Sequence, residues 1–400
     1  MRIILLNWSE GENDPFSYFN QQFQQQLVAL GHEAYIVPLN DLLSATMHEI
    51  CATVTIDLVF TWQGLGSAIG DPATGHTLWA QLGIPLVCLH GDHPCYNPAN
   101  HQQSSHHLLH VYLLPTFARD ANRLIQRDRP ALFEALPNFF QASEARPELR
   151  GDYFVLPKNL TPLADIRRGW KARHTDATYR LLCSGAEAIE HEYCHGNLRD
   201  HHEVILDVLS APIPELVRAG RADASIAEVV FALDRELDQV HRNVASEFVI
   251  ESLPDVPIRV YGRGWEHFAS RGNPYHTFTP FDRVVDGDSQ FLSALGIIDI
   301  APLNGSLHDR TLRAMRKGAG FLVSSTWRHN EPIHDEFAAL FFSGDESDLR
   351  AKVHAVRLDP EGHRARVRMF TEVFDAVFTF SDFMRRIQIH GAERGFDLSL

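Results

Sequence analysis

Short apolar runs alternate with longer amphipathic segments at both ends of the sequence. Runs of this kind are typical of buried strands, and the amphipathic segments between them are typical of helices. In the first half the candidate strands are RIILLNW (2–8), EAYIVPL (33–39), IDLVFTW (56–62), IPLVCLH (84–90) and VYLLP (111–115). Between the first two, five apolar residues recur at helical spacing from Phe16 to Leu30, and Gly31 is a plausible stop. This alternation predicts a parallel sheet with helices on both faces.

The second half repeats the pattern after a different central stretch. Residues from about 186 to 255 carry mostly helical signals. Alternation then resumes, and the C-terminal tail is helical. The predicted strands are 257–262, 275–281, 297–303 and 320–325, and the predicted helices are 289–296, 307–318, 346–358 and 361–390. Because 400 residues exceed one comfortable core, we expect two α/β domains with a cleft between them and a helical insertion in the second.

Charge and cysteine content restrict the partners and the compartment. The formal net charge of -15 argues against a nucleic-acid partner, because duplex binding needs a basic face. A small anion needs only a local positive pocket, so this class of ligand stays open. The five cysteines are scattered and never form a Cys-x-x-Cys pair, which favours reduced thiols in a cytoplasmic protein. No apolar run reaches the roughly 20 residues of a membrane span, so an integral membrane protein is not expected.

A cationic segment lies between two of the predicted strands. NGSLHDRTLRAMRKGAGFLVSS (304–325) follows the candidate strand 297–303. In an open parallel sheet, ligands bind beyond the carboxyl ends of the strands, and a helix N-terminus presents free N–H groups there. A guanidinium in the first helical turn adds a fork that matches phosphate oxygens. The alternative is a solvated helix face that pairs with surface carboxylates. The predicted phosphate or diphosphate site comprises Asn304, Gly305, Ser306, His308 and Arg310.

A second glycine-containing strand end adds to this prediction. VYGRGW (260–265) ends a candidate strand with Gly262 and Gly264. Glycines let a backbone approach a ligand closely, although an ordinary turn is the more common reason for them. Two such loops on one sheet edge would both face a phosphate group.

The segment from about 257 to 375 resembles the C-terminal domain of group-1 glycosyltransferases of the CgeB (spore maturation protein) type. The resemblance is carried by VYGRGW, by IIDIAPLNGSLHDRTLRAMRKGAGFLVSS and by LFFSGDESDLRAKVHAVRLDPEGHRARV. LHGDHP (89–94) is similar to a strand end of the family's N-terminal domain. The resemblance implies a GT-B architecture, in which two Rossmann-like domains face each other across the active site.

The resemblance also implies a division of labour between domains. Residues 1–160 would form the acceptor domain, and residues 176–370 would form the nucleotide-sugar domain with the insertion at about 186–255. The helices of 371–400 would pack back on the first domain. A sugar would move from a nucleotide-diphosphate donor to an unidentified acceptor, which could be a protein, a glycan, a lipid-linked molecule or a small molecule. No metal or other cofactor is expected, because a helix dipole and basic side chains stabilise the leaving diphosphate.

The sequence departs from the family pattern at Arg313. A glutamate often stands there and holds the ribose of the donor, whereas a guanidinium cannot accept hydrogen bonds from ribose hydroxyls. We therefore count Arg313 among the predicted donor-binding residues, although it cannot bind the ribose as the family's glutamate does. A non-catalytic binder of sugar nucleotides or carbohydrates and a nucleotide-sugar epimerase remain alternatives.

Candidate catalytic residues follow strands of the first half. An inverting transfer needs a general base near the acceptor hydroxyl. Asp92 and His93 come after the strand 84–90, and Asp14 lies in the loop after the first strand. Asp-x-Pro and Asn-Asp-Pro are also common turn sequences, which is the alternative explanation.

Histidines are abundant near the same strand. His106 and His110 have a spacing that zinc sites use, but no His-Glu-x-x-His is present and no spacing fixes an acidic ligand. We therefore expect no metal site.

Overall fold

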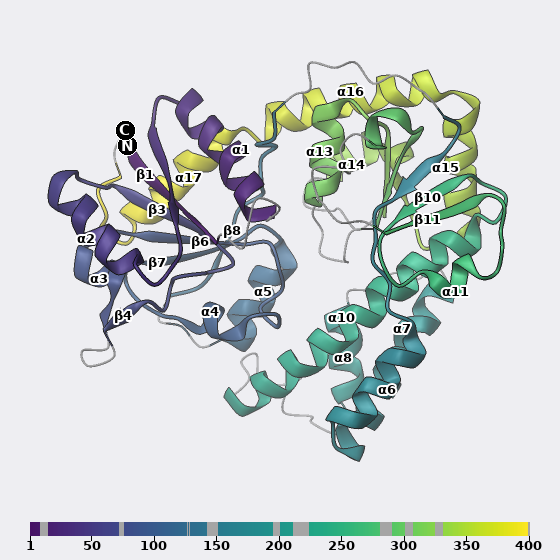
Figure 1. The fold of residues 1–400 in the computed structure, drawn as a ribbon, viewed down its shortest axis with the longest axis horizontal. Coiled ribbons are helices and arrows are strands. Elements are labelled where there is room, and N and C mark those ends of the chain that lie inside the picture. Colours follow the sequence, from purple (N-terminus) through teal and green to yellow (C-terminus); the bar gives the residue numbers. More distant parts are fainter. Residues whose placement is uncertain are drawn as a thin grey trace. The chain divides into compact units, whose positions relative to one another are not determined.

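The computed structural model describes most of the chain as two compact units. The described residues are 1–8, 15–71, 76–125, 127, 129–141, 151–194, 201–210, 224–280, 290–300, 307–324 and 331–398. Unit 1 comprises Met1–Gln141 with Asp375–Leu400, and unit 2 comprises Ala142–Phe374. Each unit contains a six-stranded parallel sheet (Figure 1). In the described part of the chain, no helix combines the length and apolar character needed to cross a bilayer.

The sheet of unit 1 has the strand order β2-β1-β3-β6-β7-β8, and every pair in it is parallel. Its strands are β1 (Arg2–Asn7), β2 (Glu33–Pro38), β3 (Leu58–Trp62), β6 (Leu86–His90), β7 (Leu108–Tyr112) and β8 (Leu132–Phe133), and a small hairpin is formed by β4 (Gly70–Asp71) and β5 (His76–Thr77). The helices are α1 (Pro15–Ala29), α2 (Leu43–Thr53), α3 (Leu78–Leu82), α4 (Pro98–Gln102), α5 (Pro115–Leu124) and α17 (Phe380–Ala392). The central strands β3, β6 and β7 are buried along their whole length, as expected of a sheet covered on both faces.

The first and last helices of the chain share one core in unit 1. Phe23 of α1 packs on Phe380 of α17 with a ring-centroid distance of 4.9 Å and on Phe60 of β3 at 5.3 Å. Figure 1 shows α17 beside α1 although the two helices lie at opposite ends of the sequence. The C-terminal helix thus belongs to the N-terminal core, because its aromatic face is buried there.

The sheet of unit 2 has the order β11-β10-β9-β12-β13-β14, and every pair is again parallel. Its strands are β9 (Phe154–Leu156), β10 (Ile258–Tyr261), β11 (His276–Thr279), β12 (Gly296–Asp299), β13 (Phe321–Ser324) and β14 (Phe341–Phe342). The helices include α11 (Glu266–Ala269), α13 (Asp309–Lys317), α14 (Glu331–Glu336), the 3-10 turn η1 (Ala338–Leu340), α15 (Glu346–Leu358) and α16 (Pro360–Val377). Counted within the unit, the order is 3-2-1-4-5-6, the arrangement of doubly wound nucleotide-binding sheets.

In the described residues between β9 and β10, unit 2 has four inserted helices. They are α6 (Leu163–Arg173), α7 (Asp176–Cys194), α8 (His201–Ser210) and α10 (Ala224–Ser252), and they pack on one another as a bundle (Figure 1). The predicted helical insertion at about 186–255 is therefore present and begins earlier, at Leu163. Trp170 is fully buried in it and donates its indole N–H to Glu236 at 2.7 Å.

Two strands differ from the sequence-based expectation. β7 spans 108–112 rather than 111–115, because His110 is buried inside it and interrupts the apolar pattern by which strands are recognised. β9 has only three residues, pairs with β10 and β12, and was not predicted. Residues 154–156 therefore belong to the sheet of unit 2, whereas the predicted first domain extends to residue 160.

Candidate functional site

The centre of the unit 2 sheet is the point where its strand order reverses. β9 and β12 are neighbours there, and the chain leaves them toward opposite sides of the sheet. In doubly wound sheets, ligands bind beyond the carboxyl ends of the strands at this position. Lys158 follows β9, is only 8% exposed, and donates from Nζ to the carbonyl of Ile300 at 2.6 Å. The side chain of Lys158 thereby links the segment after β9 to the backbone after β12.

A buried ion pair lies at the same edge. Asp299, the last residue of β12, is fully buried and accepts from Arg310 Nε at 3.0 Å and from Thr311 Oγ1 at 2.7 Å. Burial alone would raise the pKa of Asp299, but the charges of Arg310, His308 and Lys158 outweigh it and lower the pKa to about 2. The carboxylate is therefore ionised, and it orients the guanidinium of Arg310.

Arg310 retains donor capacity beyond this ion pair. Its Nη2 atom is buried and makes no hydrogen bond in the described part of the chain, although its Nε bonds Asp299. A buried guanidinium nitrogen without a partner costs free energy unless a ligand or water satisfies it. Arg310 is the second residue of α13, so this nitrogen belongs to the first turn of a helix.

Lys158 is a second basic residue at this edge. Burial, followed by the neighbouring charge of Arg310, lowers the pKa of Lys158 well below its ordinary value. Asp299 and Asp238 act in the opposite direction. Asp238 is paired with Arg242 on α10 at 2.6 Å. A bound anion would favour the charged form of Lys158, so this residue can respond to a phosphate group.

The start of α13 contains two further charged contacts. His308 precedes the helix, and its Nδ1 contacts the carboxylate of Asp309. Asp309 Oδ2 contacts Arg313 Nη2 at 3.2 Å, and the Arg313 guanidinium lies 5.8 Å from the centre of the Phe291 ring. Arg313 is only 4% exposed. Its side chain thus stabilises the helix start.

The structure shows why residues 262 and 264 are glycines, which the sequence alone did not reveal. A Cβ atom at Gly262 would lie 1.9 Å from the Lys158 carbonyl oxygen, and one at Gly264 would lie 1.8 Å from the Leu160 carbonyl oxygen. Gly264 also has a φ of +87°. Both glycines let the loop after β10 approach the segment after β9, where the indole of Trp265 donates to the Lys158 carbonyl at 2.7 Å. Their use in ligand binding stays a prediction.

Four predicted site residues lie outside the described part of the chain. They are Asp14, Asn304, Gly305 and Ser306. The described members of the predicted donor site that meet at the carboxyl edge are His308 and Arg310. Burial lowers the pKa of His308, and the charge of Arg310 acts in the same direction.

The sheet of unit 1 has its own reversal point, between β1 and β3. Asn20 of α1 donates to the Leu6 carbonyl at 3.0 Å and accepts from Trp62 Nε1 at 2.8 Å, so it joins the ends of both strands. The next residue, Gln63, has a φ of 55° and is the single non-glycine residue with positive φ among those the structure describes. Such conformations are costly and often accompany a functional constraint.

Gln63 connects this point to a predicted catalytic residue. Its Nε2 donates to Asp92 Oδ2 at 2.9 Å. Asp92 is exposed, whereas His93 is 2% exposed, with Nε2 lying 3.5 Å from buried Asp120 and Nδ1 accepting from the Cys95 amide. Of the two predicted residues after β6, Asp92 is therefore the one that solvent reaches.

Three buried side chains behind this edge could in principle hold a metal. The ligand atoms of Cys88, His90 and His110 lie within 4.8 Å of one another. Burial lowers the pKa of His110 to about 3, and the charge of Arg127 acts in the same direction. His110 is already bonded at both ring nitrogens, to His90 at 2.9 Å and to the Gln103 carbonyl at 2.8 Å. The positive charge of Arg127 and the two hydrogen bonds of His110 both oppose the binding of a cation here.

Sequence reasoning missed Lys158 and Asp299. Lys158 follows a strand too short to be recognised by periodicity. Asp299 was visible as the one acidic residue in GIIDIAPL, and a carboxylate inside an apolar strand is a usable signal because burial is costly without a partner.

Comparisons with known proteins give structural matches only. No protein-family model matches the sequence, and no curated protein matches it. An α-glucosyltransferase in complex with UDP is similar in structure, with a TM-score of 0.52, 10% identity, and coverage of 98% of this chain and 99% of that one. The same kind of enzyme with UDP and a 13-mer DNA gives a TM-score of 0.52 at 10% identity, covering 97% and 100% of the two chains. A sucrose-phosphate synthase from Thermosynechococcus elongatus gives 0.48 at 10% identity, covering 97% and 98%.

The likenesses to the α-glucosyltransferase structures establish the fold. The chain has two α/β units with parallel sheets and shares the GT-B fold of the α-glucosyltransferase structures. The narrower resemblance to CgeB-type enzymes and the predicted cleft between domains stay predictions.

Proposed function

We propose that this protein is a glycosyltransferase that moves a sugar from a nucleotide-diphosphate donor to an acceptor. The observation that carries the proposal is the buried, unpartnered Nη2 of Arg310 at the reversal point of the unit 2 sheet. The fold shared with a UDP-bound α-glucosyltransferase supports it. In this proposal the leaving diphosphate binds to Arg310 and Lys158, next to the first turn of α13.

The proposed transfer needs neither a metal nor another cofactor. Arg310 supplies a planar fork held by Asp299, and Lys158 supplies a second charge that the diphosphate would favour. Preorganised cations stabilise the charge that develops on a leaving group without reorganisation. Full activity after treatment with a chelator is expected, and loss of activity that added divalent metal restores would contradict this part of the proposal.

Asp92 is the proposed general base. It is exposed at the carboxyl end of β6, and the bond from Gln63 orients its carboxylate. General-base catalysis contributes about 10²- to 10⁴-fold to a rate. Asp92→Asn should lower kcat within this range and leave donor affinity unchanged.

The acceptor stays unidentified. The α-glucosyltransferase has been crystallised with DNA, whereas this chain carries a net charge of -15, which disfavours a nucleic-acid acceptor. Proteins, glycans, lipid-linked molecules and small molecules remain the candidates.

The donor site can be tested by calorimetric titration with nucleoside diphosphates, beginning with UDP. Arg310→Ala should weaken binding about 10- to 100-fold, the usual value of hydrogen bonds to a charged group. Arg350→Ala is the matched control, because Arg350 is a partly exposed arginine of the same unit that pairs with Glu346. Unchanged affinity in Arg310→Ala, or an equal loss in the control, would refute the proposed donor site.

A second function is favoured by Arg313. This buried arginine is committed to Asp309 and cannot accept hydrogen bonds from a ribose. A protein that binds a sugar nucleotide without transferring the sugar is therefore the competing proposal. Donor binding without hydrolysis or transfer across a panel of sugar nucleotides would favour this alternative.

A further inference from the structure

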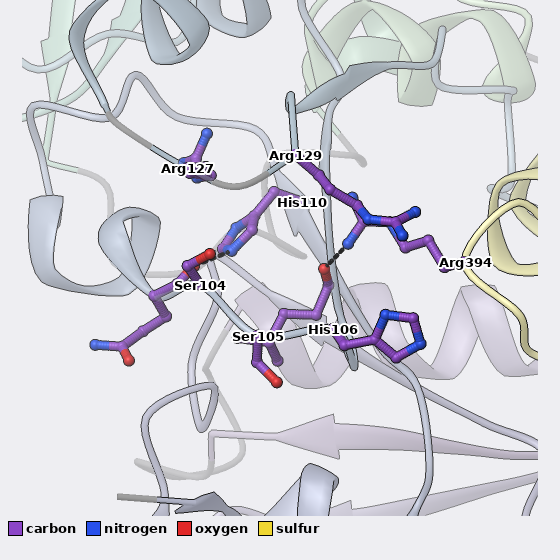
Figure 2. Close-up of a pocket in the computed structure, with 9 residues that line it drawn as sticks. Ser104, Ser105, His106, His110, Arg127, Arg129 and Arg394 are labelled. Atoms are coloured by element: carbon purple, nitrogen blue, oxygen red, sulfur yellow. Dashed lines mark hydrogen bonds between the residues drawn. The ribbon is translucent and has the colours of Figure 1, made fainter.

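A small pocket of unit 1 lies at the opposite edge of its sheet from Asp92. It is lined by the loop that precedes β7, including Ser104, Ser105 and His106, together with Arg127, Arg129 and Arg394 (Figure 2). Because the lining includes Leu108, the first residue of β7, the pocket lies at the amino end of this strand. Its volume is about 140 Å³, below the 300–1,000 Å³ typical of sites for drug-sized ligands.

The three arginines come from two segments that are close in space. Arg127 and Arg129 follow α5, and Arg394 follows α17 at the other end of the chain. Figure 2 shows the guanidinium groups of Arg129 and Arg394 next to each other. Burial lowers the pKa of Arg394, and the charges of Arg129 and Arg127 lower it further. Three guanidinium groups therefore repel one another around a small volume.

Within the described residues, the carboxylate of Glu393 acts on Arg394, but its effect is smaller than those of burial and of the charges of Arg129 and Arg127. The pocket-lining residues include none that is acidic, and none of the three arginines forms an ion pair in the described part of the chain. Each donates to backbone carbonyls instead: Arg394 to Leu108, Arg129 to Glu393 at 3.3 Å, and Arg127 to His101 at 3.0 Å. A neutral carbonyl satisfies a donor but does not cancel a charge.

The pocket also has unused donor capacity. Arg127 Nη1 is buried and makes no hydrogen bond to the residues that the structure describes. Arg394 is 8% exposed, and one of its five possible N–H donors is used in the described structure. The hydroxyl group of Ser105 and the ring of His106 also line the pocket. A compact, multiply charged acceptor would satisfy these groups together.

We propose that this pocket binds a phosphate group, either as inorganic phosphate or as the terminal group of a phosphomonoester. Guanidinium forks match the oxygens of a tetrahedral phosphate, and a dianion offsets the mutual repulsion of the three arginines. The pocket volume suits one phosphate group and excludes a whole nucleotide. This site is separate from the proposed donor site, which lies in unit 2 and at the carboxyl edge of the other sheet.

The test measures phosphate binding to the full chain in an Arg310→Ala background, which removes the other proposed anion site. Inorganic phosphate and glucose 6-phosphate are titrated calorimetrically at constant ionic strength, with glucose as the uncharged comparison. We expect phosphate or the phosphomonoester to bind and glucose not to bind. Tighter binding of glucose 6-phosphate would identify a phosphorylated ligand, and tighter binding of inorganic phosphate would identify the free ion.

Arg129→Gln is the informative variant, because Arg129 is exposed and contributes one hydrogen bond to the fold. It should weaken phosphate binding at least about tenfold. Arg385→Gln, on an exposed arginine of α17 that pairs with Asp382, should change affinity less than about twofold. The proposal is overturned if neither phosphate probe binds, if Arg129→Gln binds as tightly as its parent, or if Arg385→Gln weakens binding equally.

Discussion

The two units use the same kind of sheet, but one arginine site in each unit compensates charge in a different way. In unit 2 the carboxylates of Asp299 and Asp309 each contact an arginine, at 3.0 and 3.2 Å. In unit 1 the buried arginine Arg394 contacts a backbone carbonyl. A protein counter-ion fixes a guanidinium in place, whereas a carbonyl leaves its charge available. The difference suggests a preorganised anion site in unit 2 and an uncompensated one in unit 1.

The largest effect should follow removal of the carboxylate in unit 2. Asp299→Ala leaves Arg310 and Lys158 buried without their counter-ion, and breaking a buried ion pair from one side costs about 3–5 kcal/mol of unfolding free energy. Chemical denaturation of both proteins measures it. The control is Glu251→Ala, which removes an exposed partner of Arg271 and should cost less than about 1 kcal/mol. Similar small losses in both variants would mean that the Asp299 pair does not stabilise unit 2.

How far the sequence predicts this structure depends on the length of each element. Continuous, mostly apolar runs predicted the strands near residues 2–8, 56–62 and 84–90, because such runs are typical of strands that are buried on both faces. β9 has three residues, so neither it nor Lys158 behind it could be found in this way. Arg310 was predicted from its place after a strand, but its bond to Asp299 depends on tertiary packing that local sequence does not encode.

A second contrast concerns glycines with positive φ in the two units. Gly264 of unit 2 has a φ of +87° and lies against the Leu160 carbonyl, whereas Gly83 of unit 1 has a φ of +69° and nothing within 4 Å of the position that a Cβ atom would take. Gly83→Ala should cost about 1–2 kcal/mol from backbone strain alone. Gly264→Ala should cost at least about 1 kcal/mol more, because overpacking is added. Equal losses in denaturation would contradict the close approach of the two loops.

Mild acid should lower the free energy of unfolding of unit 1, because His90, His101 and His110 are buried there. Burial lowers the pKa of His110 to about 3 and places those of His90 and His101 well below their ordinary value of 6.5. Between pH 6.5 and the folded pKa, the unfolded state binds the proton and the folded state does not. Stability is therefore complete above pH 6.5 and is lost as the pH falls, by about 1.4 kcal/mol per pH unit for each histidine.

The His110→Gln variant isolates one histidine of this cluster. It should flatten the acid dependence by about 1.4 kcal/mol per pH unit, although its stability at neutral pH is also expected to fall. Hydrogen exchange of peptides from β6 and β7, compared with peptides from β12 and β13, assigns the loss to unit 1. An unchanged slope in the variant would show that His110 does not titrate between the two states.

The smallest expected effect on stability concerns Gln63, whose backbone has a φ of 55° at the carboxyl edge of the unit 1 sheet. Gln63→Gly and Gln63→Ala both remove the amide that donates to Asp92, so their comparison isolates the φ of 55°. At an ordinary position glycine is less stable than alanine by about 0.5–1 kcal/mol. Left-handed backbone penalises alanine by about 1–2 kcal/mol, so the glycine variant should be the more stable by up to about 1.5 kcal/mol. The sign of the difference in denaturation midpoint decides the question, because a more stable alanine variant would mean that Gln63 is not held at positive φ.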